Sequence, residues 1–224
     1  MAVLPIDSEF LQYLVGNGHL PGERLPSLAE LSDRLDVSVS KLREQLEVAR
    51  VLGLVDVKPR AGIRANAYTF HPAVRASLLC AIGLDRGKFD AFSELRNRVE
   101  ASFLHAAIAV LQLDDVRELR NLIDRAQAKL QGNPIQIPHG EHRSLHLGIF
   151  CRLANPFVTG LLEAYWDAYE AVELNHFAEY GYLCEVWEYH ARIVECIERG
   201  DSDGALLALE EHFKLLRHRP DLAA

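Results

Sequence analysis

The chain has 224 residues and a formal net charge of −8, with 49% hydrophobic and 25% charged residues. This length and composition are typical of a globular protein with one large or two small domains. The charge argues against a protein that coats nucleic acid with its whole surface, although a local basic patch can still bind phosphates. No signal peptide is recognisable, no apolar run reaches the roughly 18 residues of a membrane span, and the four cysteines are scattered without a CxxC pair. We therefore expect a cytoplasmic protein that does not cross a membrane.

The first 64 residues alternate short helical patterns with turn signals. Residues 6–17 predict a helix that ends near Gly18, and the prolines of residues 20–26 exclude helix there. Ser27 and Glu30 have the spacing of a capping box, so a second helix is expected to begin at this serine.

A third helix is expected after Ser38, which is a favourable helix cap. Gly53 stands where a helix end favours glycine, after apolar residues at helical spacing (Leu42, Leu46 and Ala49). Residues 54–57 alternate like a strand, residues 59–62 predict a turn, and Ile63 begins a return strand. Helices followed by a hairpin in this order predict a winged helix-turn-helix.

From residue 71 onward the chain is dominated by amphipathic helical patterns, after a linker at residues 65–71 with weak periodicity. Asn155 followed by Pro156 marks one helix start, and Ser202 is the expected cap of the last helix. The helices of this part are expected at residues 72–83, 88–112, 115–130, 139–153, 156–179, 183–199 and 203–217. These patterns predict a second domain that is almost entirely helical.

Residues 20–62 resemble the DNA-binding head of the GntR family of bacterial regulators. The matching features are a Pro-Gly-Glu-Arg-Leu-Pro-Ser segment, an Arg-Glu pattern within residues 42–46, and Gly-Leu-Val before the wing. The helical part resembles the FCD sensor domain of the FadR-like branch of that family. It shares with that domain a Glu-Leu-Arg motif and three further features: Glu100, the Asn155-Pro156 break, and His190 followed 22 residues later by His212.

This resemblance implies a mainly α protein, with an N-terminal winged helix-turn-helix at residues 1–66 and a C-terminal antiparallel, all-α bundle of the FCD type at residues 71–219. It also implies a homodimeric transcriptional regulator that binds a double-stranded DNA operator. The bundle of such a regulator holds a divalent metal ion and often a small organic acid as effector. The acid would favour one arrangement of the paired sensor domains over another, and the linker would transmit that difference to the heads.

The expected DNA contacts are the start of the third helix and the wing. The candidate residues are Ser38, Val39, Ser40, Lys41, Arg43, Arg60 and Gly62. Ala29 and Val39 stand where many relatives have arginine, which removes two charge-assisted contacts, although Val39 can instead touch a thymine methyl. The alternative is an ordinary amphipathic helix whose Lys41 and Arg43 are only solvated.

Four of the ten histidines have a spacing that suits a metal site. His142 and His146 project from one face of one helix, while His190 and His212 lie on the last two helices. Neutral imidazoles bind divalent ions such as zinc and nickel well. The family usually has aspartate in place of His142, so an all-imidazole set leaves the full charge of the ion to attract an anion. For any one of these histidines taken alone, the alternative is a buried core residue.

Arg96 matches an arginine that often lines the cavity of the family, and its planar fork suits the carboxylate of an effector. The alternative is an exposed arginine that pairs with Glu100 along its helix. The remaining histidines show no metal pattern. His105 and His176 are expected to be structural or to line the pocket, and three others to be exposed (His19, His139 and His218).

Two other functions are compatible with the sequence. A metal-dependent enzyme such as a hydrolase needs a general base beside an open metal position, and the chain has no HExxH or paired-acid motif that supplies them. Loss of the two arginines from the head would also suit a winged helix that binds a protein instead of DNA.

Overall fold

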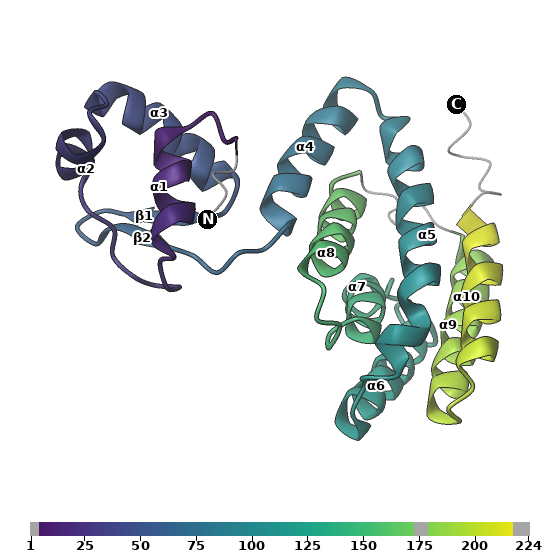
Figure 1. The fold of residues 1–224 in the computed structure, drawn as a ribbon. Coiled ribbons are helices and arrows are strands. Elements are labelled where there is room, and N and C mark those ends of the chain that lie inside the picture. The colour runs from purple at the N-terminus through teal and green to yellow at the C-terminus, as the bar shows by residue number, and fades with distance from the viewer. Residues whose placement is uncertain (1–4, 173–178, 217–224) are drawn as a thin grey trace. The chain divides into compact units, whose positions relative to one another are not determined.

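The computed structural model describes residues 5–172 and 179–216 (Figure 1). The chain forms two compact units that divide after Ser77. His176, His218 and the last residues of the second predicted domain, 217–219, lie outside the described residues.

The first unit contains three helices followed by a two-stranded hairpin, as the sequence predicts. The helices are α1 (Glu9–Asn17), α2 (Leu28–Leu35) and α3 (Val39–Val51), and the strands are β1 (Val55–Lys58) and β2 (Gly62–Ala65). The strands are antiparallel, with Val55 opposite Ala65 and Lys58 opposite Gly62. One apolar cluster joins all these elements and includes Phe10, Leu31, Leu42, Leu46, Val55 and Ile63. The predicted winged helix-turn-helix is confirmed.

Local hydrogen bonds explain where the helices of this unit begin and end. The hydroxyl of Ser27 accepts from the N–H of Glu30, and the Glu30 carboxylate accepts in return from the N–H of Ser27, so the predicted capping box is present. Ser38 caps α3 by accepting from the N–H of Lys41. Gly53 follows α3 with a φ of 74°, a conformation that favours glycine.

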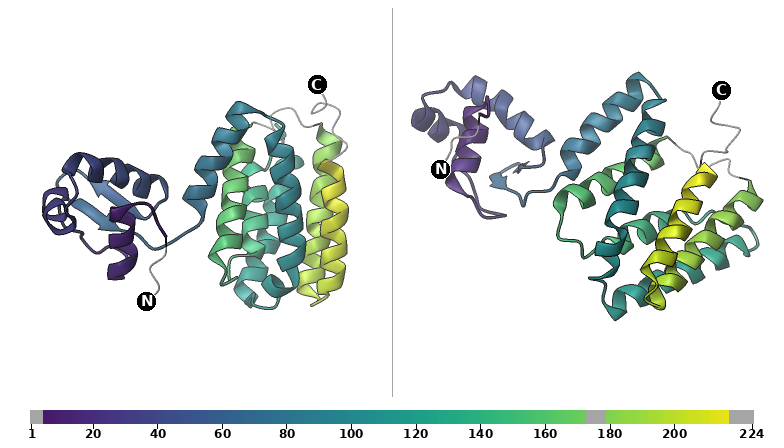
Figure 2. Two further views of the ribbon diagram at one scale, coloured as in Figure 1. Left: turned by 45° about the horizontal axis from the view of Figure 1, so that its top comes forward. Right: turned by 45° about the vertical axis from the view of Figure 1, so that its right-hand side comes forward.

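The remaining helices are α4 (His71–Leu84), α5 (Lys88–Ile108), α6 (Leu113–Leu130), α7 (His139–Ile149), α8 (Pro156–Ala171), α9 (Tyr180–Glu198) and α10 (Ser202–Leu216). Figure 2 shows α5 to α10 lying side by side as a helical bundle. Helix α9 packs against α10 and α6, and α5 packs against α10 and α8. Their shared core includes Leu104, Leu119, Leu145, Leu162, Trp187 and Val194. The prediction of a mainly α fold with a helical bundle is confirmed.

The helix boundaries differ from the predicted ones at a few caps. Helix α10 begins at Ser202 itself, because the side chain of Asp201, and not that of Ser202, accepts from the N–H of Gly204. Helix α6 begins at Leu113, before the predicted residue 115, because the side chain of Asp115 accepts from the N–H of Gln112. No described helix is both long and apolar enough to cross a membrane.

Candidate metal centre

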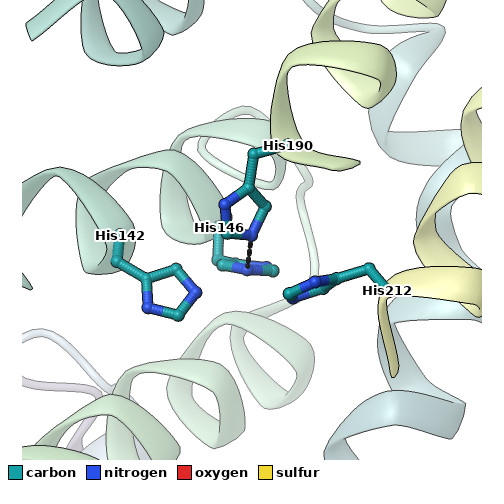
Figure 3. A group of neighbouring side chains, drawn as sticks. All are labelled: His142, His146, His190 and His212. Atoms are coloured by element: carbon teal, nitrogen blue, oxygen red, sulfur yellow. Dashed lines mark hydrogen bonds between the residues drawn. The ribbon is translucent and has the colours of Figure 1, made fainter. Parts of the chain in front are cut away.

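Three helices of the bundle bring the four predicted histidines together. His142 and His146 are one turn apart on α7, His190 lies in the second half of α9, and His212 lies near the end of α10. Figure 3 shows the four rings pointing toward a common point from these helices. One nitrogen from each ring can be chosen so that all four lie within 4.8 Å of one another. The convergence that the sequence pattern predicts is therefore present among the described residues.

The rings contact one another closely at this point. Nε2 of His146 lies 3.1 Å from Nε2 of His190 (Figure 3). The ring centre of His190 lies 4.8 Å from that of His142 and 4.4 Å from that of His212. The imidazoles are thus near enough for one small cation to reach all four after a small contraction.

Burial keeps these imidazoles neutral. His146, His190 and His212 have at most 1% of their surface exposed, and His142 is half-buried. Burial is the main reason why the pKa of each of the four lies well below the ordinary histidine value, and Arg96 lowers each pKa further. Neutral rings keep a lone pair available, which is the form that binds a metal.

Several ring nitrogens have no hydrogen-bond partner although they are buried. They are Nε2 of His142, Nδ1 of His190 and Nδ1 of His212. A buried polar atom without a partner costs about 1–3 kcal/mol, so three of them in one cluster need an explanation. A divalent cation is a suitable partner for such a donor set, and the residues present fit a metal of the imidazole-binding type.

A buried ion pair borders the cluster. Nε of Arg96 lies 2.9 Å from Oε1 of Glu100, and the two side chains are 1% and 0% exposed. Nη2 of Arg96 lies 2.8 Å from Nδ1 of His146, and Oε2 of Glu100 lies 3.3 Å from the same nitrogen. Burial raises the pKa of Glu100 to about 7, although the guanidinium of Arg96 opposes that rise.

These contacts correct one part of the alternative interpretation of Arg96. The arginine does pair with Glu100 along its helix, but it is not exposed, because the pair faces the histidine cluster. Its guanidinium carbon lies 4.8 Å from the ring centre of Tyr165 and 5.6 Å from that of Trp166. Aromatic faces stabilise a cation that has lost its water.

Among the described residues, one small cavity lies beside the cluster. A cavity of about 10 Å³ touches His142 and His212, and its other lining includes Ile137, Tyr169, Tyr182 and Trp187. That volume is close to the minimum for one water molecule. An organic acid fits there only if lining side chains move.

The other described histidines do not belong to the cluster. The side chain of His105 is 47% exposed and pairs with Asp203 of α10, a contact between two helices of the bundle. The expectation that His19 is exposed is wrong, because its side chain is 11% exposed and packs against Tyr13. His139 is half-buried and borders the small cavity.

The predicted DNA contacts lie at the start of α3 and in the hairpin. Ser38, Val39, Ser40, Lys41 and Arg43 are all exposed there. Lys41 forms an ion pair with Glu9 of α1, a partner that the sequence did not suggest. That ion pair and a hydrogen bond from Gln45 lower the pKa of Glu9 to about 2.

In the wing, Arg60 is exposed and has a φ of 66°, while Gly62 lies against Arg24. A Cβ added to Gly62 would lie 3.3 Å from Nε of Arg24. Arg24 is therefore a basic residue of the wing surface that the sequence analysis missed. Its position in a proline-rich loop gave no sign that it packs against the hairpin.

Comparison with known proteins decides the family. The FCD domain model matches residues 91–215, which is more than half of the chain and covers the whole histidine cluster. This chain belongs to the FCD-domain branch of the GntR family of transcriptional regulators.

Relatives of this regulator carry matching descriptions. The chain is 26% identical over 94% of its length to an HTH-type transcriptional regulator of Bacillus subtilis, YcbG, of which the match covers 87%. It is 24% identical over 89% of its length to the Uxu operon transcriptional regulator of Escherichia coli, of which 79% is covered.

Two solved structures share the fold of this regulator. Streptococcus agalactiae GntR superposes with a TM-score of 0.64 and 19% identity, over 93% of this chain and 95% of that one. Escherichia coli McbR/YncC superposes with a TM-score of 0.50 and 20% identity, over 95% of this chain and 96% of that one. With the family shown, the chain is a DNA-binding transcriptional regulator and not an enzyme, so the alternative of a metal-dependent hydrolase is wrong.

Proposed function

We propose that this regulator binds a divalent metal ion, preferably zinc or nickel, through His142, His146, His190 and His212. A small organic acid bound at the same centre then controls operator binding by a cytoplasmic homodimer. The observation that carries this proposal is the convergence of four neutral imidazoles, three of whose ring nitrogens are buried without a partner.

The donor set supports the choice of metal. Imidazole nitrogen favours zinc, nickel and copper, whereas magnesium and manganese favour carboxylate oxygen. When bound, the ion would supply two positive charges and, with a fifth coordination position, a place for a carboxylate oxygen.

The charge of the centre supports an anionic effector. The four imidazoles are neutral, and Arg96 pairs with Glu100. No acidic ligand offsets the charge of the cation, unlike in relatives that have aspartate in place of His142. An effector with two carboxylates therefore suits this centre better than one with a single carboxylate.

Two buried donors beside the rings suit the oxygens of such an acid. Arg96 offers a planar fork of N–H groups, and the indole N–H of Trp166 is buried without a partner. The ring centre of Trp166 lies 4.7 Å from that of His142, so this side chain borders the cluster.

The small cavity supports control by a shift in population. An acid that enters beside His142 and His212 needs a conformation in which the 10 Å³ cavity there has opened, so it binds that conformation better than the closed one. Ligand binding then stabilises the open bundle, and we propose that the linker at residues 65–71 transmits the change to the heads.

We further propose that the exposed start of α3 enters the major groove and that Arg60 and Gly62 of the wing lie against the backbone. Ser40 and Arg43 are free to face base edges or phosphates, whereas Lys41 must first leave its ion pair with Glu9. Val39 is 37% exposed, so it offers an apolar contact to a thymine methyl.

The proposal is tested on protein stripped with a chelator and then dialysed against zinc or nickel. We expect one ion per chain by elemental analysis for the wild type and for His105→Ala, whose ring is exposed. His190→Ala removes a central ligand and should retain less metal than the wild type after the same dialysis.

Gel shifts with the DNA upstream of its own gene then measure operator binding, with and without chelator and with acetate, succinate or citrate as probes. We expect the metal-loaded protein to respond to the acids and His190→Ala to be unresponsive. Wild-type protein that holds no metal after dialysis, or the same response in both variants, would contradict the proposal.

A further inference from the structure

Nδ1 of His146 has two neighbours with opposite hydrogen-bonding chemistry. Nη2 of Arg96 lies 2.8 Å away and can only donate, because a guanidinium has no acceptor. Oε2 of Glu100 lies 3.3 Å away and, when ionised, can only accept. A neutral imidazole carries one N–H, so Nδ1 can serve only one of these neighbours at a time.

The choice at Nδ1 fixes the state of the opposite nitrogen. If Arg96 donates to Nδ1, the proton of the ring is on Nε2, which faces Nε2 of His190 at 3.1 Å and donates to it. In that tautomer Nε2 of His146 has no lone pair for a cation. If Nδ1–H instead donates to Glu100, the lone pair of Nε2 points into the cluster.

We propose that Glu100 is the positioning residue that selects the metal-binding tautomer of His146. In the metal-loaded protein the hydrogen bond at Nδ1 passes from Arg96 to Glu100, and an N–H of Arg96 becomes free for an effector carboxylate. One proton leaves Nε2 and one arrives at Nδ1, exchanged through water, so the ring stays neutral. This inference rests on the proposed metal-binding function and adds a link between the metal and the acid.

The arrangement of the pair supports this role. Arg96 and Glu100 are one turn apart on α5, and Nε of Arg96 holds Oε1 of Glu100 at 2.9 Å, which leaves Oε2 facing His146. Metal-bound histidines generally donate their second N–H to a carboxylate or carbonyl. Metal binding would release Arg96 from Nδ1 of His146, and the released N–H can then bind the acid. Metal and acid are therefore expected to increase each other's affinity for the protein.

The first test observes the tautomer directly. Full-length protein with ¹⁵N-labelled histidine is measured by long-range ¹H–¹⁵N NMR, without metal and with zinc, and the signals of His146 are assigned from a His146→Gln sample. We expect the proton on Nε2 without metal and on Nδ1 with zinc. A proton on Nδ1 in both states would overturn the exchange.

The second test compares two buried carboxylates by competition with a zinc chelator. Glu100→Gln should weaken zinc binding roughly 10–100-fold, the usual effect of losing such a partner. Glu141→Gln is the matched control, because Glu141 is 8% exposed, adjoins His142 in sequence and pairs with Lys129 at 2.7 Å. It should bind zinc within about threefold of the wild type, since the Glu141 carboxylate is already paired with Lys129.

The outcomes separate this inference from the proposed function. If wild-type protein binds zinc but both variants bind it equally, Glu100 does not position His146 and only the inference fails. If wild-type protein binds no zinc at these rings, the proposed function fails and this inference fails with it. If Glu100→Gln does not fold, the NMR comparison of wild-type protein decides.

Discussion

Lowering the pH from about 7 to about 5.5 should destabilise the metal-free bundle, because unfolding releases four imidazoles that the folded bundle keeps neutral and that then take up protons. Burial lowers the pKa of His142, His146, His190 and His212 well below the ordinary value in the folded protein. The unfolded chain therefore binds more protons than the folded one in this interval. The free energy of unfolding consequently falls as the solution is acidified.

The magnitude follows from the linkage between protonation and folding. A histidine that stays neutral when folded and titrates near 6.5 when unfolded loses about 1.2 kcal/mol over this interval, so four lose about 5 kcal/mol. Glu100 has the opposite sign, because its folded pKa of about 7 lies above its unfolded one and acid stabilises the folded form. This contribution offsets about 1.5 kcal/mol of the loss from the histidines, which leaves a net loss of roughly 3.5 kcal/mol.

Urea unfolding followed by tryptophan fluorescence measures this loss. The two tryptophans of the chain, Trp166 and Trp187, both lie in the bundle, so the signal reports that unit. His190→Asn should lose about 1.2 kcal/mol less than the wild type, whereas His105→Asn, whose ring is exposed, should lose the same amount as the wild type. An unchanged free energy of unfolding across the interval would refute the reasoning, because the rings would then be protonated without unfolding.

Three further outcomes are expected. Gly53→Ala should destabilise the first unit by at least about 2 kcal/mol, because Gly53 has a φ of 74° and the new Cβ would lie 2.5 Å from Cγ of Pro72. Amide hydrogen exchange in residues 1–66 that is no faster than in the wild type would contradict this. Arg43→Ala should leave circular dichroism unchanged, weaken operator binding and lower the salt dependence by about one phosphate contact, so a folded variant with wild-type affinity would exclude this residue from the interface. His142→Asp should move the metal preference of the site from nickel toward manganese and weaken succinate binding, because the new carboxylate offsets one charge of the cation. Competition between metals measures this preference, and the same order of affinities in both proteins would contradict the charge argument.

The sequence allowed the helices and strands, and one half of the four-histidine cluster, to be predicted because these depend on local or periodic signals. Ser27 and Glu30 determine their own cap, and His142 and His146 share a face by helical spacing alone. The positions of His190 and His212 could be expected only through resemblance to a family, since no local pattern joins helices that far apart. The residues assigned to DNA contact and to metal binding remain predictions.

The environment of Arg96 could not be predicted in the same way. Spacing indicates that Arg96 and Glu100 pair, but it does not tell whether that pair faces water or the interior. Burial and the contact of both side chains with Nδ1 of His146 depend on how α5 packs against α7, which is a tertiary property. The ion pair of Lys41 with Glu9 was missed for the same reason, because the two residues are distant in sequence.

Anomalous X-ray diffraction from crystals of protein purified without added metal tests the central claim most directly. Data collected on both sides of the zinc and nickel absorption edges should give a single strong peak between the rings of His142, His146, His190 and His212, bonded to one nitrogen of each. A peak at another place in the chain, or the absence of any peak between the four rings after soaking with zinc and nickel, would contradict the account.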